Sequence, residues 1–575
     1  MRTAKTGLLT LFFVLGMLPS AMAQNTVGKI TLHGLKKTGM TAISGAAPVG
    51  FSYTSKPRVQ PHPDLVAARR GSMPKNIAAA AHPALLAVPA PTPNTVKSGG
   101  NQIGFAGLTT VDTANTNGFT VTPPDQGLCV GNGYVMETIN LVMAVYSKTG
   151  TQLTTPESVN SFFGADSAVT FLSDPRCYYD IPTQRWFASI TNVYNSSTGR
   201  SNLYLAVSET SDPTKAFTVY SIDTTDDGLN GTPNDPGCTT ASPCFGDQPL
   251  LGADGFGIYL TTNEFGVFSN TFNGAQIYAL SKADLEAGNL PTIVHIGDLP
   301  LAEGPAYSVQ PASSPDLSSE TDSGVEYFLS ALDFTGTLDN RIAVWAMTNT
   351  SSLAQAIPSV SLTNVVVNSE VYGQPPLATQ KAGPYPLGQS LGEPEETINT
   401  DDDRMQQVVF ASDHLWGALT TIVSDGTNLN AGIAYFLVKP QLNGGNLTAK
   451  IQGQSYVSVK NASVIYPAVG VTADGTAAMA FTLTGPSYFP SAAFAHVTPA
   501  HAVSVNIVAS GAAAQDDFSG YPEFGGAGYA RWGDYSWAVA DGGSLWLATE
   551  YIPGGIDSTT YFTNFGTFVY EVNLK

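Results

Sequence analysis

Small or aromatic residues alternate along short stretches of this chain, and each stretch stops at a polar residue. A period of two is typical of a β-strand with one buried face, so each stretch predicts a strand. The pattern returns seven times, which predicts a repeat architecture. The copies are MAVYSKTG (143–150), NLYLAVSET (202–210), QIYALSKADL (276–285), RIAVWAMTNT (341–350), GIAYFLVKP (432–440), AAFAHVTP (492–499) and TFVYEVNLK (567–575).

Tight turns lie upstream of these strands. Asn132-Gly133, Asp254-Gly255, Asp474-Gly475 and Asp541-Gly542 are each followed by a strand that begins with an aromatic or large apolar residue. Such pairs favour hairpin turns between antiparallel strands. One strand, a tight turn, a second strand and then the repeat strand is the plan of a propeller blade.

Composition supports the same fold class. The chain has 57 glycines and 38 prolines among 575 residues, and only 12% of its residues are charged, which favours short strands joined by turns. A chain of this length exceeds one ordinary core, and the repeats favour one large repeat-built domain. We therefore predict an all-β fold, a β-propeller of about seven blades over residues 106–575.

The first residues predict export. Arg2 and Lys5 precede an apolar run from Leu8 to Leu18, and Ala21-Met22-Ala23 follows it. This is the pattern of a signal peptide, residues 1–23, cut after Ala23. The run is too short to span a bilayer, which needs about 20 apolar residues, so we expect a secreted protein, extracellular or periplasmic, without a membrane span.

Residues 24–105 differ from the rest of the chain in composition and charge. They are rich in Ala, Pro, Gly and Lys and hold nine basic residues and one acid, whereas residues 106–575 hold 14 basic and 44 acidic residues. The segment predicts a linker or pro-segment of low order, or a basic arm that attaches to the cell surface. The acidic body repels phosphate backbones, so nucleic acid is excluded as a partner.

The four cysteines predict two disulfides, because their number is even and the chain is exported. Cys238 and Cys244 share one loop, PGCTTASPC, and we pair them with each other. Cys129 and Cys177 then form the second bridge. Neither pair has the spacing of a zinc site.

Acidic residues recur at a constant offset of seven positions before the turns. In this register they begin the inner strands and ring one mouth of the central channel. Such a ring can bind a ligand or a cation, or supply catalytic carboxylates; alternatively, each Asp caps its strand by accepting backbone N–H bonds. The candidates are Asp125, Asp174, Asp247, Asp534 and, in the fifth blade, Glu395, with Gln310 and the Tyr466-Pro467 pair in the fourth and sixth.

Arginines are scarce in the body, yet three stand beside these acids. Arg176 follows Asp174 by two residues, Arg531 precedes Asp534 by three, and Arg404 adjoins residues 401–403, which are all Asp. A guanidinium beside a carboxylate either forms a salt bridge or presents a fork to an anionic ligand.

One loop has the oxygen-rich composition of a calcium site. Its acidic and amide side chains alternate with glycines, although the spacing is not that of an EF-hand. A solvated loop of Asx turns has the same composition. The candidate metal ligands are Asp223, Asp226, Asp227, Asn230 and Asp235.

Three segments resemble uncharacterised secreted bacterial β-propeller proteins, which are loosely grouped with sialidase-like propellers. They are DPRCYYDIPTQRWFAS (174–189), GDQPLLGADGFGIYLTTNEF (246–265) and RWGDYSWAVADGGSLWLATEY (531–551). The resemblance implies fold and export more than activity. A sialidase has several Asp-box turns and an arginine triad; here Asp541–Trp546 reproduces the Asp-to-Trp part once, and Arg176, Arg404 and Arg531 are the candidates for the triad.

We expect a monomeric extracellular binding or interaction module for a glycan, a peptide or a protein, because no catalytic constellation is complete. Two other functions stay open. One is a glycoside hydrolase that uses paired carboxylates of the ring. The other is an envelope or matrix protein tethered by residues 24–105. Calcium is the one cofactor that the sequence suggests.

Overall fold

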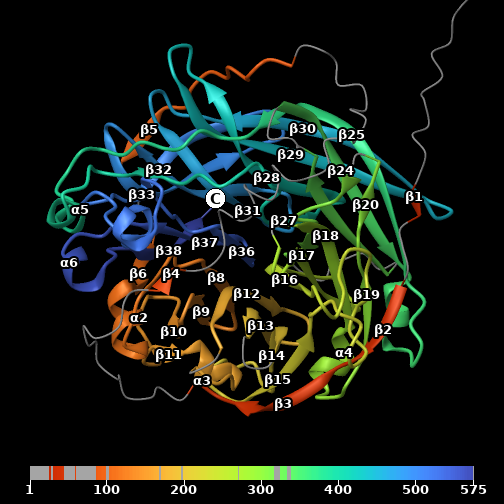
Figure 1. Ribbon diagram of the computed structural model, residues 1–575. Helices are drawn as coiled ribbons and strands as arrows, with labels where there is room; N and C mark the ends of the chain where they lie inside the picture. The colour runs from red at the N-terminus through yellow and green to blue at the C-terminus, as the bar shows by residue number, and fades with distance from the viewer. Residues whose placement is uncertain are drawn as a thin grey trace, which may run out of the picture.

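Antiparallel strands form most of the chain in the computed structural model, and their sheets surround a common centre (Figure 1). The structure describes residues 25–26, 30–43, 58–59, 86–98, 103–167, 170–195, 199–269, 271–302, 304–315, 324–332 and 338–573. The predicted signal peptide lies outside these residues. No helix in the described ranges is long and apolar enough to cross a membrane.

Each repeat segment of the sequence forms the third strand of its own sheet. Its alternating apolar residues pack between neighbouring sheets, where Trp186, Trp345 and Trp546 are among the largest fully buried side chains. The third strands are β10 (Val142–Ser147), β14 (Arg200–Ser208), β18 (Phe272–Ser281), β24 (Leu338–Thr348), β29 (Leu429–Asn443), β33 (Tyr488–Val497) and β38 (Gly566–Asn573).

The first and second strands of each sheet are antiparallel neighbours, as the turn pattern predicts. At the first turn, for example, Gly131 pairs with Tyr134 across Asn132-Gly133. The pairs are β8 (Gly127–Gly131) with β9 (Tyr134–Ile139), β12 (Leu172–Asp180) with β13 (Arg185–Asn195), β16 (Cys244–Ala253) with β17 (Gly257–Gly266), β22 (Gln310–Ser313) with β23 (Val325–Ala331), β27 (Val408–Ala411) with β28 (His414–Ser424), β31 (Ser463–Val471) with β32 (Ala477–Gly485) and β36 (Trp537–Asp541) with β37 (Ser544–Tyr551).

The first strands lie round the centre of the molecule. Consecutive first strands contact one another from β8 through β12, β16, β22, β27 and β31 to β36, and β36 contacts β8 again. Figure 1 shows β8, β12, β16, β27, β31 and β36 about this centre. Between β22 and β27 the contact is a short parallel pairing, Ala312 with Val408, which joins two sheets into one.

The sheet that contains the C-terminus is completed by a strand from far upstream. β6 (Ile103–Thr109) pairs antiparallel with β38, with Gly104 opposite Tyr570. This pairing joins the two ends of the ring. Other fourth strands follow their third strands in sequence: β11 (Glu157–Ser158), β15 (Phe217–Asp223), β19 (Thr292–Ile296), β25 (Ser361–Gly373), β30 (Asn446–Val457) and β34 (Ala502–Ala509).

The strands described upstream of residue 103 differ from a free linker, because four of them extend the outer edges of sheets and one forms a two-stranded sheet with a strand of the body. Edge pairing uses backbone groups and needs no side-chain period, so the sequence pattern did not predict it. Leu35 and Ile43 are also buried against the body. The added strands are β1 (Asn25–Thr26) on β25, β2 (Ile30–Gly34) on β19, β3 (Lys36–Thr41) on β15, β4 (Arg58–Val59) on β7 (Val121–Thr122) and β5 (Val96–Ser98) on β34.

Both predicted disulfides are confirmed. Cys129 bonds Cys177 and so links β8 to β12, the first strands of two adjacent sheets. Cys238 bonds Cys244 and closes the loop before β16.

Candidate functional site

Left-handed backbone recurs in or before the first strand of six of the seven sheets. Non-glycine residues rarely adopt positive φ, so its repetition marks a built feature of the ring. In β12, β16 and β31 the residue precedes a proline and sits at a shift of the pairing register. The residues are Asp125, Asp174, Gln248, Ser308, Asp401 and Tyr466, with φ between 41° and 59°.

Two expected ring residues, Asp247 and Glu395, are not at the left-handed positions. Gln248, and not Asp247, is the equivalent of Asp174. The offset fails because Asp174 lies six residues before the last pair of β12, at Asp180, whereas Gln248 lies only five before the last pair of β16, at Ala253.

In the fourth sheet, Gln310 begins the inner strand β22, as expected, and Ser308 holds the left-handed position before it. The second difference lies in the fifth sheet. Glu395 lies in the long connection before β27, near Gly383 and Asp516, and Asp401 holds the left-handed position. The long connection changed the spacing, so a fixed offset from the turn did not find this residue.

Asp125 is the most fully engaged acid of the ring. Its Oδ1 accepts the backbone N–H of Asp534 at 2.7 Å, and its Oδ2 accepts Nδ2 of Asn140 at 2.7 Å. Asn140 Oδ1 in turn accepts the backbone N–H of Asp174 at 2.9 Å. Carboxylate oxygens of Asp125, Asp174 and Asp534 all lie within 4.8 Å of one another. Asp125 therefore accepts one backbone N–H, and that group belongs to another sheet and not to its own strand.

In other sheets, polar residues of second strands have the role that Asn140 has for Asp174. Asn263 Oδ1 accepts the backbone N–H of Ser308 at 2.7 Å, and Thr420 Oγ1 accepts that of Tyr466 at 3.1 Å. In each case a side chain of one sheet binds the left-handed residue of the next sheet. The sequence analysis missed these residues; alignment of the second strands on the repeat would have placed Asn140, Asn263 and Thr420 at comparable positions.

Burial changes the titration of the ring. Burial, and after it the nearby Asp174, raises the pKa of Asp125 to about 7. Burial and then Asp125 raise the pKa of Asp534 to about 7. Carboxyls with such pKa values suit general acid catalysis, but Asp125 is fully buried and its oxygens are engaged.

Arg404 is held by acids on its own connection. Its Nε lies 2.7 Å from Asp402 Oδ1, its Nη2 lies 2.8 Å from Asp402 Oδ2, and Asp401 approaches to 2.9 Å. Nη1 donates to Gln248 Oε1 of β16. Arg404 is 3% exposed at its side chain, so its donors serve the protein itself.

The other two arginines are also bound by groups of the protein. Arg176 Nε donates to the carbonyl of Pro249 at 2.8 Å, and its guanidinium carbon lies 3.2 Å from the centre of the Tyr535 ring, a cation–π contact. Arg531 lies 3.5 Å from Asp534. Both arginines are buried.

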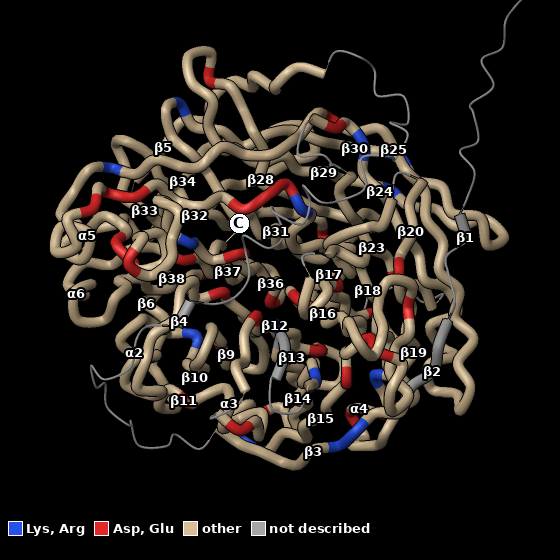
Figure 2. The backbone as a smooth tube through the Cα atoms, viewed as in Figure 1, with Lys and Arg blue, Asp and Glu red and all other residues tan. Residues whose placement is uncertain are grey.

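The structure brings the predicted arginine set together. Arg176, Arg404 and Arg531 all lie within electrostatic reach of Asp534. Figure 2 shows acidic positions close to the centre near β12, β16 and β36. The ring is thus a buried network in which guanidinium groups neutralise carboxylates.

A second acidic group lies away from the centre, in the loop that the sequence analysis assigned to calcium. Two of its acids bind Arg200 instead: Nε donates to Asp223 Oδ2 at 2.7 Å, and Nη1 to Asp227 Oδ2 at 2.5 Å. Asp227 also closes an Asx turn to Leu229. Asn230 and Asp223 line a cavity of about 560 Å³ nearby.

Two other acids of the same loop meet an acid of β17. Carboxylate oxygens of Asp226, Asp235 and Glu264 lie within 4.8 Å of one another. We call these three residues the rim cluster. Burial and then Asp235 raise the pKa of Asp226 to about 7, and burial and then Asp226 raise that of Glu264. Nothing in the sequence near the loop pointed to Glu264.

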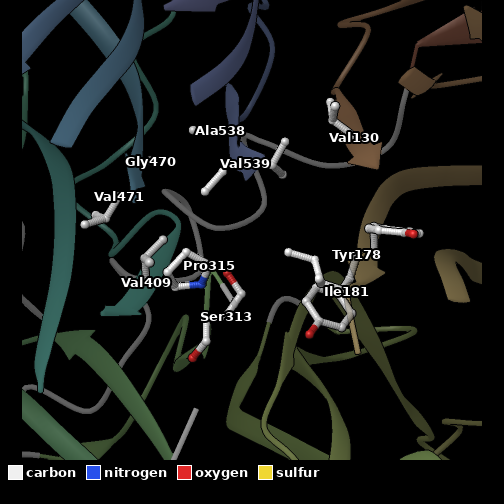
Figure 3. A pocket seen from close by; sticks show the side chains of 13 residues that line it. Val130, Tyr178, Ile181, Ser313, Pro315, Val409, Gly470, Val471, Ala538 and Val539 are labelled. Carbon is white, nitrogen blue, oxygen red and sulfur yellow. The ribbon is translucent and has the colours of Figure 1, made fainter. Parts of the chain in front are cut away.

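A pocket opens at the end of the channel where the first strands finish. Figure 3 shows its side chains arranged round one common space. Among the residues that the structure describes, those that line the pocket carry no charge. They are Val130, Tyr178, Tyr179, Ile181, residues 313–315 (Ser-Ser-Pro), Val409, Gly470, Val471 and residues 538–540 (Ala-Val-Ala).

The fold and this buried ring define a propeller-like β protein. No protein family model and no curated protein sequence matches the chain. Its likeness to solved structures is loose and extends to the fold alone.

Among those structures, a sialidase from a Hadza microbiome matches at 8% identity and a TM-score of 0.33, over 77% of this chain and 73% of its own. The extracellular domains of Drosophila semaphorin 1b match at 10% identity and 0.32, over 84% and 88%. An ancestral GH74 enzyme matches at 10% identity and 0.34, over 82% and 51%.

Proposed function

We propose that this protein is a secreted, seven-bladed propeller that binds an uncharged extracellular ligand in the pocket where its first strands end. The closed series of contacts among the first strands supports the blade number. Two disulfides support export, because such bonds persist in oxidising compartments.

The observation that carries the proposal is the contrast between the two ends of the channel. The carboxylates and arginines are mostly buried, with 13% of the Asp534 side chain exposed, and they bind one another or backbone groups. The pocket is open, and its described lining residues are uncharged. A sialidase needs free guanidinium groups for an anionic sugar, and a glycosidase needs two carboxyls about 5 to 9.5 Å apart that substrate reaches. Neither requirement fits the engaged ring, so binding is favoured over hydrolysis.

The pocket lining also limits the ligand. Most lining residues are apolar, and the polar groups are serine and tyrosine hydroxyls. A neutral sugar needs many hydrogen-bonding partners, whereas an apolar side chain of a peptide or protein segment needs a concave apolar surface. A peptide or protein segment is therefore the ligand that we favour.

The test is a binding screen of the purified protein against an array of apolar peptides and an array of neutral oligosaccharides. Ile181→Glu places a charge in the pocket without disturbing the core, because Ile181 is 39% exposed. We expect this variant to lose affinity about tenfold or more, since an unpaired charge must be desolvated on binding.

Ile357→Glu is the matched control, because Ile357 is an exposed isoleucine outside the pocket, 74% accessible. It should bind as the wild type does. A peptide that binds Ile181→Glu with full affinity contradicts the proposed site. If only neutral sugars bind, the ligand is a sugar and not a peptide. If the protein hydrolyses a glycoside and Asp534→Asn abolishes this activity, the protein is a hydrolase and not a binding module.

A further inference from the structure

Buried polar side chains share one face of the sheet near the rim cluster. On β18, Gln276 lies opposite Thr262 of β17, and Tyr278 lies opposite His295 of β19. Cross-strand partners and residues two apart point to the same face, which places Glu264 on it as well. Figure 2 shows acidic positions near β18 and β19, away from the centre. The face is polar, yet all of these side chains are buried.

The loop of residues 224–243 supplies the other two acids. The backbone N–H of Asp235 donates to both carboxylate oxygens of Asp226 at 3.1 Å. Asp226 and Cys244 exchange two backbone hydrogen bonds of 3.0 Å, and the Cys238–Cys244 disulfide closes the same loop. Cys238 Sγ lies 3.6 Å from Glu264 Oε2, so the loop is held against this face.

The spacing of the rim cluster suits a hard cation. Calcium takes oxygen ligands at about 2.3–2.6 Å, so two oxygens on one ion lie no more than about 5 Å apart. The oxygens of Asp226, Asp235 and Glu264 meet this limit at 4.8 Å. The nearby cysteines are oxidised and offer no thiolate, which leaves an all-oxygen donor set.

A second observation points to a ligand here. In the described part of the chain, Glu264 Oε1, Gln276 Nε2 and Tyr278 Oη are buried without a hydrogen-bond partner, and all three residues are 1% exposed or less. A Cβ added at Gly297 would collide with both Asp235 Oδ2 and Gln276 Oε1, so the Gln276 amide adjoins the cluster. Three unsatisfied polar atoms round one acidic group need a partner.

We propose that Asp226, Asp235 and Glu264 bind a calcium ion that joins the loop of residues 224–243 to the sheet of β16–β19. Water ligands of the ion supply partners to Gln276 and Tyr278. Among the described residues, no lysine or arginine pairs with Asp226 or Glu264, because Arg200 binds Asp223 and Asp227 instead. The ion therefore neutralises Asp226 and Glu264, whereas Asp235 also lies 4.0 Å from Nε2 of His295.

The experiment is a calcium titration of the full-length protein after removal of metal with EDTA, read by calorimetry and by the thermal midpoint. We expect saturable binding and a higher midpoint in calcium, since a ligand of the folded state stabilises it. Glu264→Gln keeps the side-chain shape but removes a charge, and it should lower calcium affinity about tenfold or more.

Two further comparisons keep the test decisive if a variant is less stable. In EDTA, Glu264→Gln should melt at or above the wild-type midpoint, because it relieves repulsion among buried acids. Asp534→Asn, in the channel group that has the same oxygen spacing, should bind calcium as the wild type does. Absence of calcium binding to the wild type, full affinity in Glu264→Gln, or loss of binding in Asp534→Asn would each overturn the proposal.

Discussion

The channel ring and the rim cluster are both groups of buried carboxylates, yet they differ in what compensates their charge. In the ring, Arg176, Arg404 and Arg531 lie among the acids. At the rim, Arg200 binds the flanking acids Asp223 and Asp227. The carboxylate oxygens lie within 4.8 Å of one another in both groups, so the neighbouring residues separate an ion-pair network from a cation site. The chain itself supplies the cationic groups of the ring, whereas the rim cluster, as we propose, takes its cation from the solution.

Removal of one arginine from each region tests whether the ring arginine contributes more to stability than the rim arginine. Arg404→Ala leaves Asp401 and Asp402 buried without their guanidinium, which we expect to lower the free energy of unfolding by about 4 kcal/mol. Arg200→Ala removes a partly exposed pair and should cost about 1 kcal/mol. Urea unfolding at constant pH and calcium measures both. Equal losses in the two variants would show that the ring arginine is no more integral than the rim arginine.

The two disulfides extend the same comparison to covalent links. Removal of the Cys129–Cys177 bond, which spans 48 residues between β8 and β12, should cost about 4 kcal/mol, because a long loop regains more entropy in the unfolded chain. Removal of the Cys238–Cys244 bond, which spans six residues, should cost about 2 kcal/mol. Double alanine variants compared by urea unfolding test the ranking. The rim variant should also bind calcium more weakly, and a reversed ranking would contradict the entropic argument.

Glu137 is a buried acid outside both groups. In the described structure it pairs with neither an arginine nor a clustered acid. Its Oε2 accepts the backbone N–H of Leu108 in the closing strand β6 at 3.0 Å, and Thr567 donates to its Oε1. Burial raises its pKa to about 7 from 4.5. A raised folded-state pKa means that the folded protein binds the proton more tightly than the unfolded chain does.

The contribution of Glu137 should therefore be complete below pH about 4.5 and be lost as the pH rises through about 7. Its size is on the order of 3 kcal/mol. Glu137→Gln holds no titrating proton, so its unfolding free energy in EDTA should fall less than that of the wild type over this range. Parallel pH curves for the two proteins would show that Glu137 does not titrate there.

Much of the fold could be predicted from local patterns. The seven repeat segments are third strands, and the Asx-Gly turns join first to second strands, because alternation and turn chemistry are set by neighbours in sequence. The disulfide between Cys238 and Cys244 followed from their short separation. The ring was found in part, since Asp125, Asp174 and Asp534 come together as the offset predicts, but Gln248 and Asp401 stand where Asp247 and Glu395 were expected.

The kind of strands, their turns and the Cys238–Cys244 pair could be read from the sequence, since these depend on residues a few positions apart. The Cys129–Cys177 pair followed because these were the two cysteines left. The individual long-range contacts of the acids, in contrast, were set by the tertiary fold. Asp125 binds the N–H of Asp534 across 409 residues, and Glu264 joins a loop that lies tens of residues upstream. Strand β6 likewise closes the ring against the C-terminal strand. Such contacts join residues that are far apart in the sequence, and a local sequence pattern does not predict them.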